Sequence, residues 1–239
     1  MALYTIADLH LSHATDKPMS IFGSRWTDHR EKIRTRWSSL IEDSDTVVIP
    51  GDVSWAMTLE EAAEDFRFID SLPGRKIISK GNHDYYWTTA SKMTKFFSEI
   101  GVTSINLLHN NAYVADGFAI CGSRGWFIEE KMQGGHFDTD HEKLVARECM
   151  RLDASLKCGC EMDPSAEPVV FLHFPPVFGD FVCRPLTGIM KKYGVSRCYY
   201  GHIHGKYSLP QSVDFEGIEM ILISADFLDF TPQRVFSRG

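Results

Sequence analysis

The chain has 239 residues, 44% apolar and 24% charged, a composition typical of a globular enzyme with a substantial core. Its formal net charge of −7, without basic stretches interleaved with aromatic residues, argues against a general nucleic-acid-binding surface. No apolar run approaches the ~18 residues of a membrane-spanning helix, and a strand expected from residue 3 leaves no room for a signal peptide, so we expect a cytoplasmic protein without a membrane partner.

Helix-like and strand-like segments alternate along the first half of the chain. The apolar periodicity predicts helices over residues 27 to 42, from the capping box of Thr58 and Glu61 onward, and over residues 88 to 100. Short apolar runs between these helices predict strands. Such alternation is the signature of βαβ units around a largely parallel sheet, so the sequence indicates the α/β class.

The second half carries a predicted hairpin and one long helix. Asp116-Gly117 predicts a turn within a hairpin over residues 112 to 122, and apolar residues at helical spacing predict a helix over residues 138 to 156. We interpret Cys158-Gly-Cys160 as the exposed end of this helix rather than as a metal or redox pair. No linker interrupts the chain, so residues 1–239 are expected to form a single domain.

Polar side chains that can bind metal ions follow five short apolar runs. The runs cover residues 3–7, 46–50, 76–80, 169–172 and 197–200. The candidate ligands that follow them are Asp8, His10, Asp52, Asn82, His173, His202 and His204. A strand delivers the residues after it to its carboxyl end, where open α/β sheets bind ligands. We therefore expect these side chains to converge on one site.

The spacing and chemistry of these donors indicate two metal ions. Asp8-Leu9-His10 and His202-Ile203-His204 each place two polar side chains on one side of extended backbone. Carboxylate, imidazole and amide donors without thiolates suit divalent Mn, Fe or Zn, with Co and Ni as further options. Two ions sharing one carboxylate would use all these donors, and a water between them would have its pKa lowered from about 15.7 toward neutrality, giving a bridging hydroxide nucleophile.

The series D-x-H, G-D, G-N-H-D, H and G-H-x-H, in this order over residues 8 to 204, resembles that of the calcineurin-like metallophosphoesterase superfamily. The resemblance implies a four-layer α/β/β/α sandwich with a dinuclear metal site at the carboxyl ends of its strands. It implies that one metal is held by Asp8, His10, Asp52 and His204. The second would be held by Asp52, Asn82, His173 and His202, with Asp52 as the bridging ligand.

The resemblance also assigns roles to His83 and Asp84. His83 matches the superfamily histidine that stabilises the phosphoryl group or protonates the leaving oxygen. Asp84 is expected to orient the ring of His83 and to raise its pKa. The arginine and glutamate that mark the Ser/Thr protein phosphatases of the superfamily are absent, which argues against a phosphoprotein substrate. The string Gly51-Asp-Val-Ser-Trp-Ala-Met57 looks like that of a group of bacterial predicted phosphohydrolases.

A phosphoester also needs a cation for its remaining oxygens. Arg124, beside glycines at the end of a predicted strand, is our candidate, with a rim salt bridge as the alternative. Gly134-Gly135 within residues 123–137 suggests a mobile flap. Weaker candidates for lining the substrate cleft, for which simple packing or solvation is the alternative, are Trp55, Tyr85, Trp126 and Arg184.

We expect metal-dependent hydrolysis of a phosphomonoester or phosphodiester in a small phosphorylated substrate. The sequence leaves open the ester class, the identity of the metals and the oligomeric state. A metal-dependent nuclease is one alternative, because two-metal sites also cut nucleic acid, but no basic stripe supports it. A non-catalytic binding scaffold on the same fold is another, against which every candidate ligand and His83 are intact.

Overall fold

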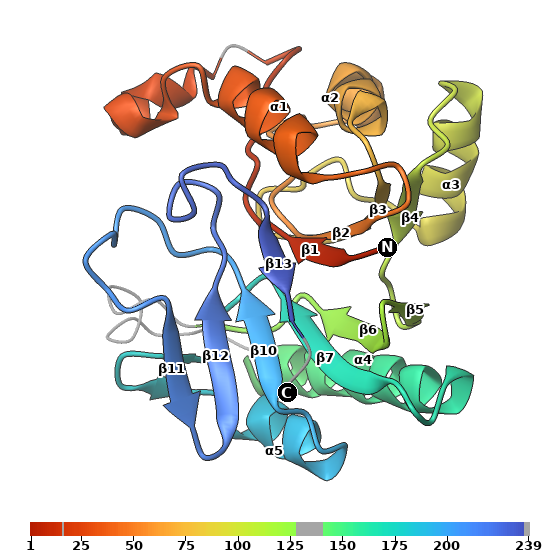
Figure 1. The fold of residues 1–239 in the computed structure, drawn as a ribbon, viewed down its shortest axis with the longest axis vertical. Coiled ribbons are helices and arrows are strands. Elements are labelled where there is room, and N and C mark those ends of the chain that lie inside the picture. Colours follow the sequence, from red (N-terminus) through yellow and green to blue (C-terminus); the bar gives the residue numbers. More distant parts are fainter. Residues whose placement is uncertain (16, 128–140, 237–239) are drawn as a thin grey trace.

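Two β-sheets pack face to face between two groups of helices in the computed structural model, which describes residues 1–15, 17–127 and 141–236 (Figure 1). The first sheet is covered by helices α1 (His29–Leu40), α2 (Leu59–Ser71) and α3 (Ala90–Glu99). The second sheet is covered by α4 (His141–Met162) and α5 (Arg184–Lys192). Two short 3₁₀ helices, Met19–Phe22 and Ser24–Trp26, precede α1. These are the four α/β/β/α layers that the family resemblance implied.

The first sheet has the strand order β13-β1-β2-β3-β4. Neighbouring strands from β1 to β4 run parallel, and β13 pairs antiparallel with β1. Its strands are β1 (Leu3–Thr5), β2 (Thr46–Pro50), β3 (Arg75–Ser79), β4 (Ile105–Leu107) and β13 (Gln233–Val235). The carboxyl ends of β1, β2 and β3 therefore lie at one edge, as the alternating segments predicted.

The second sheet has the order β11-β12-β10-β7-β6-β5. Its central strands β12, β10, β7 and β6 are parallel, and β11 and β5 pair antiparallel at the two edges. A hairpin of β8 (Val177–Phe178) and β9 (Phe181–Val182) lies apart from it. The sheet's strands are β5 (Tyr113–Ala115), β6 (Phe118–Ser123), β7 (Glu167–Leu172), β10 (Arg197–Tyr200), β11 (Ser212–Phe215) and β12 (Ile218–Leu222).

Three apolar clusters fill the spaces between the four layers. Along β2, Val47 and Ile49 face the helices of the first sheet, whereas Val48 faces the second sheet. Along β7, Phe171 faces the first sheet and Leu172 faces the helices α4 and α5. Successive side chains of a strand point to opposite faces, so strands buried on both faces read as continuous apolar runs. This is why the strand predictions were clear in the sequence.

The helices begin and end close to the predicted residues. At the start of α2, the Thr58 hydroxyl accepts the N–H of Glu61 at 3.3 Å, which confirms the capping box. The Glu61 carboxylate accepts the N–H of Met57 at 2.8 Å, one residue before the cap. None of the described helices has both the length and the apolar composition needed to cross a membrane.

The predicted hairpin and long helix are both present, with one correction. Asp116 and Gly117 have φ values of 51° and 78°, as a two-residue hairpin turn requires. Helix α4 continues to Met162, beyond the predicted end at residue 156, so Cys158-Gly-Cys160 lies within its body and is partly buried. A Cβ at Gly159 would lie 2.6 Å from Sγ of Cys121, so this glycine lets α4 pack closely on β6.

Candidate metal centre

The residues that follow β1 lie where the two sheets meet. The N–H of Ala7 donates to the carbonyl of Ile223 at 2.9 Å, and the N–H of Ala225 donates to the carbonyl of Ala7 at 2.9 Å. Asp8 comes next, and its N–H donates to the carbonyl of Gly51 at 3.1 Å. The end of β1 therefore bonds both to the loop after β2 and to the chain after β12. Residues from both sheets converge on Asp8.

Asp8, His10 and His204 form one group that could hold a metal ion. One ligand atom of each lies within 4.8 Å of the others. The Nε2 atoms of the two histidines are 3.2 Å apart. Asp8 and His10 are buried, whereas the His204 side chain is partly exposed. A carboxylate and two imidazole nitrogens at this spacing can coordinate one divalent ion.

Asp8, Asp52 and His173 form a second group, which shares Asp8 with the first. His173 Nδ1 lies 3.5 Å from Asp8 Oδ1, and its Nε2 lies 3.6 Å from Asp52 Oδ2. The same Nε2 is 2.6 Å from Oδ1 of Asn82. Asp52 Oδ2 also lies 3.8 Å from Nε2 of His10. Both carboxylates thus face both groups, as a pair of neighbouring cations would require.

His202 completes the set of candidate ligands. The backbone N–H of His202 donates to Asp8 Oδ2 at 2.8 Å, and the centroid of its ring lies 5.2 Å from that of His173. The structure therefore brings all seven residues that the sequence singled out into one cluster.

The backbone of this cluster differs from the extended form that the sequence suggested. The φ values are 59° at Asp8, 46° at His10, 51° at Asp52 and 71° at His202, all in the left-handed region. Non-glycine residues held there cost ~1–3 kcal/mol each and persist where the surroundings over-determine them. The His10 N–H, for example, donates to the carbonyl of Asp52 at 3.0 Å. The ligands thus lie on tight turns after the strands.

Glycines allow the turns after β2 and β3 to touch backbone to backbone. A Cβ at Gly81 would lie 2.1 Å from Oδ1 of Asp52 and 2.3 Å from its backbone nitrogen. A Cβ at Gly51, where φ is +93°, would lie 2.6 Å from the nitrogen of Gly81. Neither position has room for a side chain, so the G-D and G-N motifs are steric requirements of the cluster.

Burial raises the pKa values of the carboxylates in this cluster and lowers those of its imidazoles. Burial raises the pKa of Asp8 to about 6, and burial with the nearby Asp84 and Asp8 carboxylates raises that of Asp52 well above its usual value. Burial also lowers the pKa of His10 and His173 well below their usual range. A neutral imidazole keeps a lone pair for a metal, and a nearby cation favours the ionised carboxylate.

Several buried atoms of the cluster have no hydrogen-bond partner among the described residues. They are Asp8 Oδ1, Asp52 Oδ2, His10 Nδ1 and His173 Nδ1. Buried polar atoms are nearly always hydrogen-bonded unless a ligand takes the partner's place. The donor set, its burial and these unpartnered atoms all fit divalent metal ions.

Residues 1–206 match the family model described as calcineurin-like phosphoesterase. The chain belongs to the calcineurin-like phosphoesterase family. It is therefore a hydrolase that acts on phosphoester bonds, in a family that typically uses a dinuclear metal site.

Two solved structures resemble this phosphoesterase. The phosphopantetheinyl hydrolase from Mycobacterium tuberculosis covers 100% of this chain and 98% of its own, with a TM-score of 0.56 and 14% identity. A protein of unknown function from Aquifex aeolicus covers 98% of this chain and 95% of its own, with a TM-score of 0.49 and 18% identity. At such identities the likeness shows the fold alone. No curated protein matches the chain.

Asp84 has a different role in the phosphoesterase from the one that the resemblance implied. Its buried carboxylate accepts the N–H groups of Asp52 at 2.9 Å, Val53 at 2.8 Å and Gly81 at 2.6 Å, and the hydroxyl of Tyr86 at 2.9 Å. These bonds tie the turn after β2 to the turn after β3. Asp84 thus holds the backbone that presents Asp52.

His83 lies beside the cluster, but its ring is not oriented by Asp84. The backbone N–H of His83 donates to Asp52 Oδ1 at 2.8 Å. In the ring, Nδ1 lies 3.4 Å from the hydroxyl oxygen of Tyr85. The ring packs against Trp55, with centroids 4.1 Å apart. Burial, followed by the charge of His204, lowers the pKa of His83 to about 4. The expected increase of this pKa was wrong, because the carboxylate that would cause it points to the backbone.

Asp226, which was not among the residues singled out from the sequence, contacts the His204 ring at Nδ1. Asp226 Oδ1 lies 2.7 Å from Nδ1 of His204, and Oδ2 accepts the N–H of Gly205 at 3.1 Å and the hydroxyl of Tyr207 at 3.0 Å. A signal was present in the sequence, because Asp226 also follows an apolar strand, β12. Burial lowers the pKa of His204, but Asp226 and Asp8 outweigh it and the net shift is upward.

Asp226→Asn is expected to weaken Mn²⁺ binding by about 10- to 100-fold, because the carboxylate behind a ligating histidine sets its tautomer and basicity. Titration calorimetry of the metal-stripped protein with Mn²⁺ measures the Kd. Tyr207→Phe, which removes another contact of the same carboxylate, serves as the control and should change the Kd little. An unchanged Kd in Asp226→Asn would show that His204 is oriented without Asp226.

An aromatic cavity of about 440 Å³ opens beside the first metal group. His10, His83 and His204 form the side next to the cluster. Lys17 Nζ lies 4.3 Å from the ring centroid of Trp55, which lines this cavity. Its other walls are Met19, Phe22, Trp26, Trp55, Gly205, Tyr207 and Asp226. The suggestion that Trp55 lines the substrate cleft agrees with this cavity.

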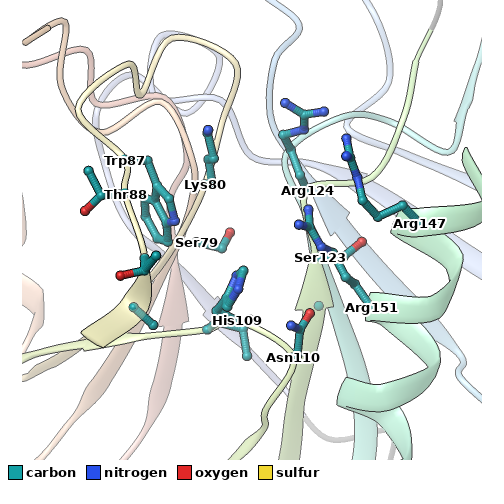
Figure 2. A pocket seen from close by; sticks show the side chains of 14 residues that line it. Ser79, Lys80, Trp87, Thr88, His109, Asn110, Ser123, Arg124, Arg147 and Arg151 are labelled. Atoms are coloured by element: carbon teal, nitrogen blue, oxygen red, sulfur yellow. The ribbon is translucent and has the colours of Figure 1, made fainter. Parts of the chain in front are cut away.

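Arg124 follows β6 and points into a separate, basic cavity (Figure 2). Its carbonyl accepts the N–H of Phe174, which follows the candidate ligand His173, at 2.9 Å. Among the described residues Arg124 forms no ion pair, and its buried Nε has no hydrogen-bond partner. The rim salt bridge considered from the sequence is therefore not observed in the described chain.

The remaining cleft candidates differ in position. Tyr85 is half exposed beside His83, and Trp126 packs near Phe174 with ring centroids 6.1 Å apart. Arg184 lies at the start of α5 and pairs with Glu216 at 3.3 Å, in the turn before β12, so it is at the opposite end of the sheet from the cluster. The proposal for Arg184 was wrong. Most of the suggested flap, residues 128–137, lies outside the described residues.

Proposed function

We propose that this phosphoesterase hydrolyses a phosphomonoester or phosphodiester of a small phosphorylated molecule, with two divalent metal ions as cofactors. The observation that carries the proposal is the pair of overlapping groups around Asp8, in which four buried atoms have no hydrogen-bond partner among the described residues: Asp8 Oδ1, Asp52 Oδ2, His10 Nδ1 and His173 Nδ1. The assignment of all seven candidate ligands, with Asp52 between the ions, remains part of this proposal.

The ions we propose are Mn, Fe or Zn, with Co and Ni as further options, because carboxylate and imidazole donors without thiolate suit such metals. Asp8, His10, Asp52 and His204 would hold one ion, and Asp52, Asn82, His173 and His202 would hold the other, so that Asp52 is shared. When bound, two such ions would polarise the phosphoryl oxygens and lower the pKa of a water between them.

The protein's own groups position the substrate in this proposal. His83 stays neutral near pH 7, because burial lowers its pKa to about 4, and its ring can donate a hydrogen bond to the leaving oxygen. The proton that completes the leaving alcohol then comes from solvent. The carboxylate of Asp84 holds the turns that carry Asp52 and Gly81 together, because it accepts the backbone N–H groups of both residues. Arg124 supplies positive charge next to the turn that carries His173.

The aromatic cavity is the proposed place for the leaving group. It borders His83 and is walled by Trp26, Trp55, Phe22 and Tyr207, so it suits an apolar or planar alcohol. The net charge of −7 argues against free nucleic acid as the substrate.

Metal-stripped protein is expected to be inactive, and Mn²⁺ is expected to restore turnover of 4-nitrophenyl phosphate or bis(4-nitrophenyl) phosphate. The two ions are needed both for the nucleophile and for charge stabilisation. Initial rates with the paired esters identify the preferred ester class. Because a structural neighbour is a phosphopantetheinyl hydrolase, a phosphopantetheinyl ester is the next substrate to test. Equal turnover with and without Mn²⁺, after verified metal removal, would contradict the proposal.

A further inference from the structure

A basic cavity of about 410 Å³ shares no lining residue with the aromatic cavity. Figure 2 shows Lys80 on one side, at the end of β3, and Arg124, Arg147 and Arg151 on the other, from the end of β6 and from α4. The beginning of α3 adds Thr89 and Ala90 to its wall. Four cationic side chains from three elements therefore surround one hollow.

The charge of this cavity is opposite to that of the whole chain. No carboxylate is among its described lining residues, although the chain has a net charge of −7. The nearby Glu148 is buried and pairs with Arg151 at 2.7 Å, while its other oxygen accepts the N–H of Arg124 at 3.2 Å. Lys80 and Arg147 form no ion pair within the described residues. The excess positive charge would make binding of an anion in this cavity favourable.

Two polar groups at the wall lack hydrogen-bond partners among the described residues. Ser79 is 1% exposed, its Oγ has no partner, and Figure 2 shows this hydroxyl directed into the cavity. The Nε of Arg124 is buried and also without a partner. These unpartnered donors would gain hydrogen-bond partners when an anion binds.

The cavity shares two of its walls with the metal centre. Lys80 directly precedes Gly81 and Asn82, and the carbonyl of Arg124 bonds to Phe174, next to His173. An anion in the cavity would therefore lie against the turns that carry Asn82 and His173.

We propose that this basic cavity binds a second phosphate group of the substrate, so that the preferred substrate is a small molecule with two phosphates. One phosphate would be hydrolysed at the metal centre, and the other would be held by Arg124, Arg147, Arg151 and Lys80. Guanidinium groups suit this role because their N–H fork matches phosphate oxygens. This inference rests on the proposed function, and its test is designed to separate the two.

The first test counts phosphate sites in the Mn²⁺-loaded protein by titration calorimetry with inorganic phosphate. Wild type is expected to bind two phosphates, and Arg147→Glu one, because loss and reversal of an exposed guanidinium should weaken the basic cavity by about 10- to 100-fold. Lys157→Glu makes the same charge change on α4 away from the cavity and should still bind two. Equal stoichiometry in wild type and Arg147→Glu would overturn the inference. If only the metal-centre proposal fails, wild type binds one phosphate and Arg147→Glu none.

The second test compares kcat/KM for adenosine 3′,5′-bisphosphate and adenosine 5′-monophosphate. Wild type and Lys157→Glu are expected to prefer the bisphosphate by at least about tenfold, and Arg147→Glu should lose this preference, since one charge-assisted contact is worth about that factor. Both substrates offer the same 5′ ester, so folding or metal loss would lower both rates together. A bisphosphate preference that survives Arg147→Glu would contradict the role of the cavity.

Discussion

Asp52→Asn is expected to reduce phosphoester hydrolysis by the Mn²⁺-loaded protein by about 10³-fold, a loss of several kcal/mol of transition-state stabilisation. The amide keeps the shape and the oxygen that accepts the His83 N–H at 2.8 Å. It removes the negative charge between His173 Nε2 at 3.6 Å and His10 Nε2 at 3.8 Å. Steady-state kinetics with verified metal content measures the effect.

The fold of this variant should survive without metal. Burial raises the pKa of Asp52, so in the metal-free protein this carboxylate destabilises the folded state as pH rises above its unfolded pKa of about 3.9. Metal-free Asp52→Asn should therefore be at least as stable as metal-free wild type at pH 7. Asp43→Asn, an exposed change before β2, is the control and should alter neither property. Full activity of metal-loaded Asp52→Asn would refute the role of Asp52.

Gly81→Ala is expected to destabilise the protein by about 3 kcal/mol or more and to prevent assembly of the metal centre. The added methyl would lie 2.1 Å from Asp52 Oδ1 and 2.3 Å from the Asp52 nitrogen, so the turns after β2 and β3 would have to separate. The structure can relax little around this methyl group, because the atoms that it would meet belong to the backbone and to the carboxylate of Asp52. Urea unfolding measures the change.

Gly188→Ala serves as a control, because it is expected to change the free energy of unfolding in the opposite direction. Gly188 lies in helix α5, and a Cβ there meets no atom within 4 Å. Alanine at an exposed helical site should stabilise the protein by about 0.5–1 kcal/mol. If both substitutions changed the free energy of unfolding equally, close packing of the two turns would not explain the glycine at position 81.

Local pattern predicted the strands and helices well, because each is encoded within a short stretch of sequence. The run over residues 46–50 is apolar on both faces and forms β2 with those bounds. The capping box at Thr58 begins α2 as expected. The end of α4 was missed, because Gly159 reads as a helix stop, whereas in the fold it allows contact with Cys121.

Tertiary contacts decided what local pattern cannot show. Asp84 was expected to face the His83 ring, but its carboxylate accepts five hydrogen bonds from donors in the turns after β2 and β3. Those donors are 2 to 32 residues away along the chain, so no spacing rule reveals them. Arg184 was suggested to line the substrate cleft, but it pairs with Glu216 instead. Local sequence could not show this, because the neighbours of Arg184 depend on the order of the strands in the sheet.

The sequence by itself determined the α/β class, the candidate ligands and the resemblance to the metallophosphoesterases, because these depend on residue types at strand ends. Only the tertiary structure decided that Asp8 joins two groups of ligands, that Asp226 supports His204, and that Lys80 meets three arginines around one cavity. These relations join residues from different strands and helices. They follow from the packing of two sheets against each other, which sets distances that chain order does not contain.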